Sequence, residues 1–518
     1  TTIFDILEQS CSRYGDSPAF SSGADTLTFN QLRGRADAFA RYLRQHAGLQ
    51  PGDRLAIQLP NLLQYTIAIF GALRAGLVIV NTNPQYTYHE TRHQFADSGA
   101  RAVVVLDKLV PLVRKIQGAT EIETLIVTSM DDYSNPQFDS SESDEVRFMQ
   151  ALRLGDELPT IETERGLDDL ALLQYTGGTT GVAKGAMLTH ANLVANLTQV
   201  RPMLEDQVEE GKEVVIAPLP LYHIYSFTLN CGIMLEAGAH NVLIPNPRDI
   251  PGFVKELQKQ KFSAFIGLNT LFVALCNNED FQDLDFSGLK LTASGGMALT
   301  SDTAKMWQRV TGCEISEGYG MTETSPVVTF NPRSAIQIGT IGLPIPSTVV
   351  KTIDDDGNET PVGEPGELCV KGPQVMRGYW QRPDDTQKSF TDDGFLKTGD
   401  VALIQEDGYI RIVDRKKDMI IVSGFNVFPN EIEDVVTTHP KVVECAAVGI
   451  ADAKSGEAVK VYVVPTKEGV TANEIKEFCR ERLTAYKVPK HFEFRDELPK
   501  SNVGKILRRE LRDEANAK

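Results

Sequence analysis

A segment rich in glycine, threonine and lysine has the residue types needed to bind a polyphosphate. It reads LLQYTGGTTGVAKG and spans Leu172–Gly185. Glycines allow positive φ and close approach of the backbone to a ligand, and successive N–H groups can enclose an anion. Hydroxyl donors and one ammonium group would complete the site, so the candidate phosphate-binding residues are Thr176, Gly177, Gly178, Thr179, Thr180, Gly181 and Lys184.

This segment is not a Walker P-loop, which requires the pattern GxxxxGK[ST]. Gly181 and Lys184 are separated by two residues, and neither Ser nor Thr follows the lysine. The sequence therefore disfavours a P-loop NTPase but still predicts phosphate binding. The alternative is a flexible surface loop.

The elements around this segment predict an α/β fold. Helical periodicity covers Phe29–Gln45, and a buried helix followed by a strand is expected over Ile67–Val80, which is shorter than a bilayer span. Apolar runs without polar alternation are typical of strands covered on both faces, hence of parallel sheets with helices. These runs are Arg54–Gln58, Ala102–Leu106, Glu213–Ala217, Asn241–Ile244, Ala264–Gly267 and Leu289–Ala293.

The remaining segments differ from these apolar runs in composition and in the pattern of turn residues. Residues 130–165 are acidic and rich in serine, so we expect a surface excursion or linker there. From about Gly339, short strands alternate with turn signals, which predicts a small antiparallel β unit. The charged string DRKKD at Asp414–Asp418 is either a hinge or a solvated turn. We therefore expect a large N-terminal domain over 1–413, a hinge over 414–418 and a small α+β domain over 419–518.

Composition excludes several classes of protein. The 518 residues carry 52 basic and 70 acidic side chains, a net charge of −18, which opposes binding to nucleic acid. Seven cysteines without a CxxC pair argue against a disulfide framework and a structural zinc site. The N-terminal residues show no signal-peptide pattern, so the expected location is the cytoplasm.

Seven further motifs follow the glycine-rich segment, and each alone is also consistent with ordinary turns or core packing. They are PLPLYHIYSF (218–227), ASGGM (293–297), EGYGMTET (317–324), GELCVKGPQVMRGYW (366–380), LKTGD (396–400), VDRKKDMIIVSGFNVFPNEIE (413–433) and PKSNVGKILRREL (499–511). In this order the set resembles the adenylate-forming superfamily, and the resemblance covers essentially the whole chain. Within that superfamily, the stretch 396–429 is most similar to bacterial long-chain fatty-acid–CoA ligases, which are acyl-CoA synthetases.

The resemblance implies a two-step reaction with ATP, Mg²⁺ and coenzyme A. Fatty acid and ATP would give acyl-AMP and pyrophosphate, and coenzyme A would then displace AMP to give acyl-CoA. Two related activities remain open: transfer of the acyl group to a carrier protein, and activation of medium-chain or aryl acids. Peripheral association with the inner face of the cell membrane and a homodimer are also open expectations, while acyl-chain length is not encoded in the motifs.

The resemblance also assigns roles to nucleotide-binding residues. Tyr319 would contact adenine, Thr322 the α-phosphate and Glu323 the Mg²⁺ ion. Asp400 would accept hydrogen bonds from the ribose hydroxyls, with Arg415 assisting it. The small residues expected to border the adenine or the acyl chain are Ser294, Gly295, Gly296, Gly318 and Gly320.

The remaining implied roles concern catalysis and the second step. Lys505 would reach between the substrate carboxylate and the α-phosphate, where it would stabilise developing charge. His223 would line the entrance for the acyl group, and Phe227 stands where some relatives have a gating tryptophan. The pantetheine path is expected at Ser423 and Gly424, and Lys417 matches the position about which the C-terminal domain rotates.

The hinge assignment predicts an unequal effect of stiffening the chain. Replacing Lys417 by proline fixes φ, so thioester formation should lose more rate than acyl-AMP formation. Separate assays of the two steps will measure this ratio. Equal losses in both steps would contradict a hinge at Lys417.

Overall fold

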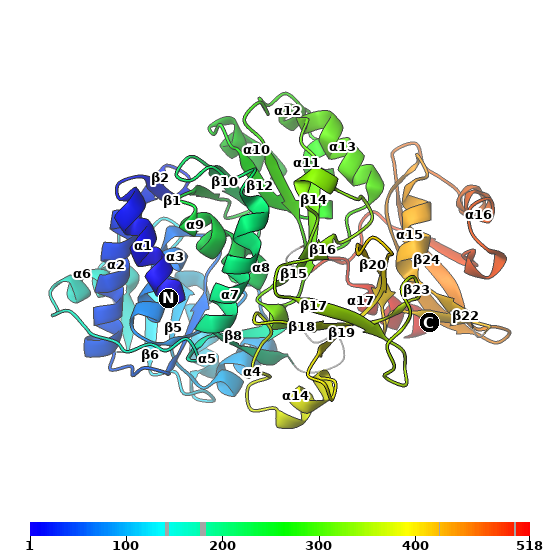
Figure 1. Cartoon of the computed structure of the whole chain (residues 1–518). Coiled ribbons are helices and arrows are strands. Elements are labelled where there is room, and N and C mark those ends of the chain that lie inside the picture. Colours follow the sequence, from blue (N-terminus) through cyan, green and yellow to red (C-terminus); the bar gives the residue numbers. More distant parts are fainter. Residues whose placement is uncertain (140–143, 177–182, 424, 502–503, 518) are drawn as a thin grey trace.

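A computed structural model describes residues 1–139, 144–176, 183–423, 425–501 and 504–517. Within these residues the strands form four sheets. The N-terminal helices lie at one end of the molecule, and the orange and red C-terminal elements lie at the opposite end (Figure 1). The mixed α/β architecture expected from the apolar runs is confirmed.

A seven-stranded sheet organises the first part of the chain. Its strands pair in parallel except for the last pair, β8 and β9, which is antiparallel. The strands, in spatial order, are β7 (Glu145–Arg147), β6 (Thr124–Thr128), β5 (Ala100–Leu106), β3 (Arg54–Gln58), β4 (Val78–Asn81), β8 (Leu170–Thr176) and β9 (Lys184–Thr189).

Helices cover both faces of this sheet, which explains the apolar runs in its central strands. Leu55 and Ile57 pack with the helices of one face, and Ala56 between them packs with those of the other. The first group is α1 (Ile3–Tyr14), α2 (Phe29–Arg41), α3 (Leu63–Arg74) and α6 (Phe148–Asp156), and the second is α4 (Tyr88–Ser98) and α5 (Val110–Gln117).

A nine-stranded sheet carries most of the predicted site. Its central strands β11, β10, β12, β13 and β14 are parallel neighbours. In spatial order the strands are β16 (Leu343–Pro344), β15 (Val327–Phe330), β14 (Ile315–Gly320), β13 (Leu291–Ser294), β12 (Ala264–Gly267), β10 (Val214–Ala217), β11 (His240–Leu243), β1 (Pro18–Ser22) and β2 (Asp25–Thr28).

Helices also flank the nine-stranded sheet. Helix α13 (Ser301–Thr311) buries Trp307. The Trp307 ring lies 4.7 Å from that of Phe272 and 5.2 Å from that of Phe265, so aromatic packing fixes this helix to β12. The helices of this region are α7 (His190–Val200), α8 (Ile224–Thr228), α9 (Met234–Glu236), α10 (Ile250–Gln258), α11 (Asn269–Cys276), α12 (Glu279–Gln282) and α13 (Ser301–Thr311).

The last third of the chain forms two smaller sheets. The antiparallel unit expected after Gly339 is β17 (Val349–Ile353), β18 (Gly366–Lys371), β19 (Leu396–Ile404) and β20 (Ile410–Arg415), with α14 (Pro383–Ser389) inserted. The final sheet contains β21 (Ile420–Val422), β22 (Phe425–Val427), β23 (Val442–Asp452), β24 (Gly456–Pro465) and β25 (His491–Phe494). Around it lie α15 (Pro429–Thr437), α16 (Ala472–Arg480) and α17 (Arg508–Ala517).

The structure corrects the expectation of a surface excursion or linker over residues 130–165. Residues 145–156 are not a surface linker, because β7 extends the seven-stranded sheet and α6 buries Phe148 and Leu152 against α2.

The helix and strand expected over Ile67–Val80 are α3 and β4. All seven cysteines are buried and unpaired. Among the described helices, none has the length and apolarity needed to cross a membrane.

The contact between α2 and α6 predicts a strong size limit at Gly155. A Cβ atom there would lie 1.9 Å from the carbonyl oxygen of Ala38, so Gly155→Ala should lower the free energy of unfolding by about 1–3 kcal/mol. Urea unfolding will measure the change. Gly118→Ala is the matched control, because its φ is −66° and a Cβ would have open space. Equal stability of the two variants would contradict the close packing.

Candidate functional site

Three predicted motifs lie at the carboxyl ends of parallel strands in the nine-stranded sheet. The segment containing His223 follows β10, which ends at Ala217, while β13 ends at Ser294 and β14 at Gly320. Because the carboxyl ends of parallel strands share one edge, residues far apart in sequence meet there. This edge is the usual ligand-binding edge of an open α/β sheet.

These motifs line one cavity of about 60 Å³. Its apolar walls include Val200, Leu204, Met234, Ile266 and Leu291. The predicted site residues that line it are His223, Ser294, Gly295, Gly296, Gly318, Tyr319 and Gly320. The lining is therefore apolar along the walls and polar at the glycine-rich edge.

Two glycines at this edge leave no room for a side chain. A Cβ on Gly295 would approach the ring of Tyr225 to 3.1 Å, and one on Gly320 would lie 2.0 Å from the carbonyl oxygen of Pro326. The buried hydroxyls of Tyr225 and Ser294 lack a hydrogen-bond partner among the described residues. The cavity therefore presents two polar groups that a ligand could satisfy.

Tyr379 connects Lys184, at the end of the glycine-rich segment, to Glu323, the predicted Mg²⁺ ligand. The ends of β8 and β9 place Thr176 opposite Lys184, while Gly177, Gly178, Thr179, Thr180 and Gly181 lie outside the described residues. Lys184 Nζ lies 3.3 Å from Asp385 Oδ2 and 5.0 Å from the centre of the Tyr379 ring. The Tyr379 hydroxyl donates to Glu323 Oε1 at 2.7 Å. Burial raises the pKa of Glu323, opposed by this hydrogen bond.

A second polar group joins Tyr319, Asp400 and Arg415. The Tyr319 hydroxyl donates to Asp400 Oδ2 at 2.5 Å, and Arg415 Nε lies 3.7 Å from Asp400 Oδ1. Asp400 and Arg415 are directly opposed on β19 and β20, which turns both side chains to the same side. Thr322, beside Glu323, begins a short 3₁₀ turn directly after β14.

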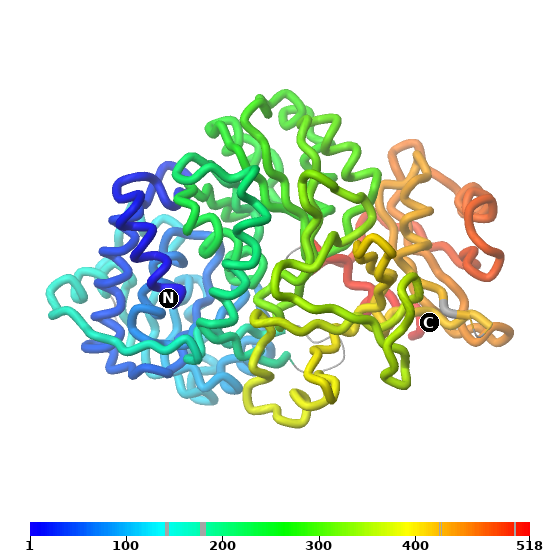
Figure 2. Tube along the Cα trace, viewed as in Figure 1, coloured from blue at the N-terminus to red at the C-terminus, as the bar shows by residue number. Residues whose placement is uncertain are grey.

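Lys505 reaches this region from the C-terminal part of the chain. The red segment that contains it turns back toward the centre of the molecule (Figure 2). Thr270, at the start of α11, donates from Oγ1 to the carbonyl of Gly504 at 3.3 Å. Gly504 has φ of +81°, a backbone conformation that favours glycine.

The surroundings of Lys505 are electrostatically unusual. Burial, together with the charges of Arg415 and Lys417, lowers the pKa of Lys505 to about 7, and Asp400 partly offsets this. Burial and the Lys505 charge lower the pKa of His223 to about 4. The His223 imidazole is therefore neutral at pH 7, and its Nδ1 accepts from the Tyr225 backbone N–H at 3.3 Å.

Some predicted residues lie away from the cavity. Phe227 is 2% exposed and packs in the main hydrophobic core, not in the cavity wall. Ser423 is exposed at the turn after β21, and Gly424 lies outside the described residues. Lys417 is half-buried near the polar group, and its carbonyl accepts from Arg512 at 3.2 Å.

Sequence reasoning missed three residues that the structure joins to this region. Tyr379 connects Lys184 to Glu323, Asp385 pairs with Lys184, and Thr270 holds the Lys505 segment. Tyr379 lies within the GYW end of a motif already noted, which was a usable signal. Asp385 and Thr270 carry no local pattern that marks them.

Known proteins are similar to this chain over essentially its whole length. The profile of the AMP-binding enzyme family matches residues 7–380, and that of the AMP-binding enzyme C-terminal domain matches residues 431–505. A long-chain-fatty-acid–CoA ligase of Escherichia coli O6:H1 is 52% identical over 100% of this chain and 95% of its own length. The anthranilate CoA ligase AuaEII in complex with anthranoyl-AMP superposes with a TM-score of 0.91, at 26% identity, over 99% of this chain and 97% of its own.

A further comparison concerns conformation. ATP-bound MatB from Rhodopseudomonas palustris superposes with a TM-score of 0.87, at 29% identity, over 99% of each chain. The apo form of MatB from the same organism gives 0.77. The arrangement of this chain is thus closer to that of the ATP-bound form.

The lowered pKa of Lys505 predicts an unusually reactive amine. A lysine-specific acylating reagent should modify Lys505 with a half-maximal rate near pH 7, because its neutral form dominates above that pH. In urea the midpoint should return to about 10.4, the value of an unperturbed lysine. Lys417→Met should raise the midpoint in the folded protein, because it removes a neighbouring positive charge. Peptide mapping after labelling across a pH series will test this, and a folded-state midpoint above pH 9 would contradict it.

Proposed function

The chain belongs to the AMP-binding enzyme family, and we propose that it is an ATP-dependent ligase joining long-chain fatty acids to coenzyme A. In the first step, a carboxylate oxygen attacks the α-phosphorus of ATP, and pyrophosphate leaves. In the second step, the sulfur of coenzyme A attacks the acyl carbon, and AMP leaves. The long-chain substrate follows from relatives such as the 52% identical ligase of Escherichia coli.

One observation carries this proposal: Lys505 lies beside a polar edge that continues into an apolar cavity. Its charge lowers the pKa of His223, which lines that cavity, and the charges of Asp400 and Arg415 at the edge act on Lys505 in turn. An acid bound in the cavity would point its carboxylate at this edge. There, the Lys505 ammonium would stabilise charge that develops between carboxylate and α-phosphate.

We assign the nucleotide to the polar edge. Tyr319 would flank the adenine, and Asp400 would accept hydrogen bonds from the ribose hydroxyls with Arg415 beside it. Thr322 would contact the α-phosphate, and the glycine-rich segment with Lys184 would hold the β- and γ-phosphates. Support comes from the Tyr319–Asp400 contact and from the placement of Lys184 near Glu323.

Glu323 is suited to hold the Mg²⁺ ion that accompanies ATP. It is a buried carboxylate that accepts a hydrogen bond from the Tyr379 hydroxyl. No group of three or more metal-binding side chains occurs within the described ranges of the chain. Mg²⁺ is commonly held by one or two carboxylates together with substrate phosphates, so this donor set fits. When bound, the ion would neutralise phosphate charge.

For the second step, we propose that residues 419–518 rotate as a unit about 414–418 against residues 1–413. The hydrophobic clusters around the last sheet contain only residues from Ile420 onward, which supports an independent unit. Rotation would withdraw Lys505 and bring the exposed turn at Ser423 toward the acyl-AMP, opening a path for the pantetheine arm.

The lysine assignment gives a direct test of the function. The wild-type protein should release pyrophosphate with fatty acids and ATP, and should form AMP and acyl-CoA only when coenzyme A is added. Lys505→Ala should slow pyrophosphate release by about 10²–10³-fold, while thioester formation from synthetic acyl-AMP stays near the wild-type rate. A panel of acids from C4 to C18 will report the chain-length preference.

Lys500→Ala is the matched control, because Lys500 lies in the same segment and pairs with Glu444 at 2.8 Å. It should leave both steps unchanged. The proposed function is wrong if the wild-type protein releases no pyrophosphate with any acid. The role of Lys505 is wrong if its replacement slows both steps alike.

A further inference from the structure

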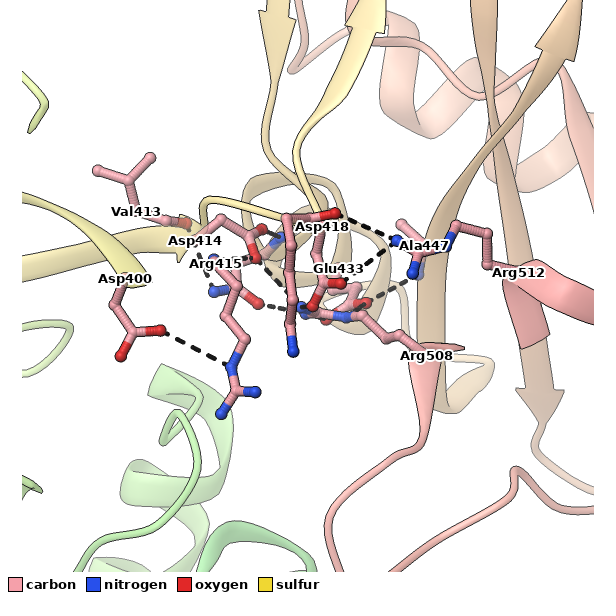
Figure 3. Close-up of polar contacts among 11 residues, drawn as sticks. Asp400, Val413, Asp414, Arg415, Asp418, Glu433, Ala447, Arg508 and Arg512 are labelled. Carbon is pink, nitrogen blue, oxygen red and sulfur yellow. Dashed lines mark hydrogen bonds and ion pairs between the residues drawn. The ribbon is translucent and has the colours of Figure 1, made fainter. Parts of the chain in front are cut away.

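A partly buried arginine, Arg508, joins two carboxylates that come from different parts of the chain. Its Nη1 lies 3.2 Å from Asp414 Oδ1, and its Nε and Nη2 lie 2.9 Å and 2.5 Å from the two oxygens of Glu433. The Arg508 side chain is 18% exposed and that of Asp414 is 0% exposed. Figure 3 shows the guanidinium enclosed by these groups.

Both carboxylates also accept hydrogen bonds from backbone N–H groups. Asp414 accepts from the backbone N–H groups of Arg415 and Asn430, each at 2.7 Å. Glu433 Oε1 accepts from the backbone N–H of Ala447 at 2.7 Å. Because buried charges are tolerated when paired and fully hydrogen-bonded, the group holds one geometry, and loss of one partner is costly.

The two halves of this cluster differ in their relation to the proposed hinge. Glu433 and Arg508 both follow Lys417, so their ion pair lies within the unit proposed to rotate. Asp414 precedes Lys417, so its contacts with Arg508 and Asn430 cross the hinge. Arg512 adds contacts at the proposed hinge itself, to the Lys417 carbonyl at 3.2 Å and to Asp418 at 3.5 Å. Figure 3 labels Arg512 and Asp418 beside Arg508.

The same arginine lies next to the catalytic lysine proposed above. Arg508 is the first residue of α17 and follows Lys505 by three positions. The Lys505 segment is thus held on one side by Thr270 and on the other by Arg508. A rotation at Lys417 changes the directions of the bonds to Asp414, and those bonds weaken steeply when misaligned.

We propose that Arg508 is a positioning residue which, through Asp414, clamps the hinge in the orientation that presents Lys505 for acyl-AMP formation. The clamp must open before the thioester step. Arg508 does not touch the reacting atoms; it acts through Lys505. This inference rests on the proposed two-step function.

The test compares the two carboxylate partners of the same guanidinium. Asp414→Asn weakens the contact that crosses the hinge, so acyl-AMP formation should slow by about tenfold or more. Thioester formation from synthetic acyl-AMP should be unchanged or faster. Glu433→Gln, the matched control, weakens the contact within the rotating unit and should change both steps by the same factor.

A second variant covers the case in which Asp414→Asn does not fold. Arg508→Lys keeps a positive charge but loses the forked geometry, so it should also slow the first step more than the second. Arg509→Lys is its control, because Arg509 pairs with Asp513 at 3.5 Å on the exposed face of α17. Equal slowing of both steps in Asp414→Asn and Arg508→Lys would overturn the clamp.

A readout independent of activity separates this inference from the proposed function. An open clamp exposes the hinge backbone, so trypsin should cleave Arg508→Lys after Lys417 faster than it cleaves the wild type or Arg509→Lys. Unchanged cleavage rates would overturn the clamp even if both steps proceed. A wild-type protein that lacks both activities would overturn the function, while faster cleavage would still support the clamp.

Discussion

The burial of positive charge where the C-terminal segment meets the central sheets is the constraint on which the rest of the site depends. Arg415 and Lys417 lie close enough to Lys505 to lower the pKa of its ammonium group. The charge of Asp400 partly offsets this lowering. Removing charges from water is costly unless opposite charge is supplied. A polyanion such as a nucleoside triphosphate would supply this opposite charge, even though the chain as a whole carries a net charge of −18.

The parallel sheets explain how such a site is assembled from distant segments. The carboxyl ends of β10, β13 and β14 bring His223, Ser294 and Tyr319 to one edge. Small residues at that edge keep the backbone accessible, and the apolar side chains beneath it leave a cavity. One edge thus offers both a polar and an apolar surface, as required for an acid with a long hydrocarbon chain.

The polar cluster around Arg508 connects the C-terminal part of the chain to the proposed hinge. The bonds to Glu433 hold α17 to α15 within the C-terminal part, whereas the bond to Asp414 connects that part to β20. Since the same guanidinium makes both, it links the segment that carries Lys505 to β20, where the proposed hinge begins. A reaction with two steps needs such a connection to be specific and also breakable.

The sequence by itself determined the fold class, the strands Arg54–Gln58 and Ala264–Gly267, and the motif residues that line the cavity, because these depend on local periodicity and on residue types at fixed spacing. It predicted a linker where β7 and α6 lie, because the acidic, serine-rich composition of the stretch outweighed the few apolar residues that pack on α2. Only the tertiary structure decided that Tyr379 binds Glu323, that Phe227 packs in the core, and that Arg508 pairs with Asp414. Partners separated by 56 or 94 positions leave no local pattern, and the pKa of Lys505 arises from burial, which exists only once the chain has folded.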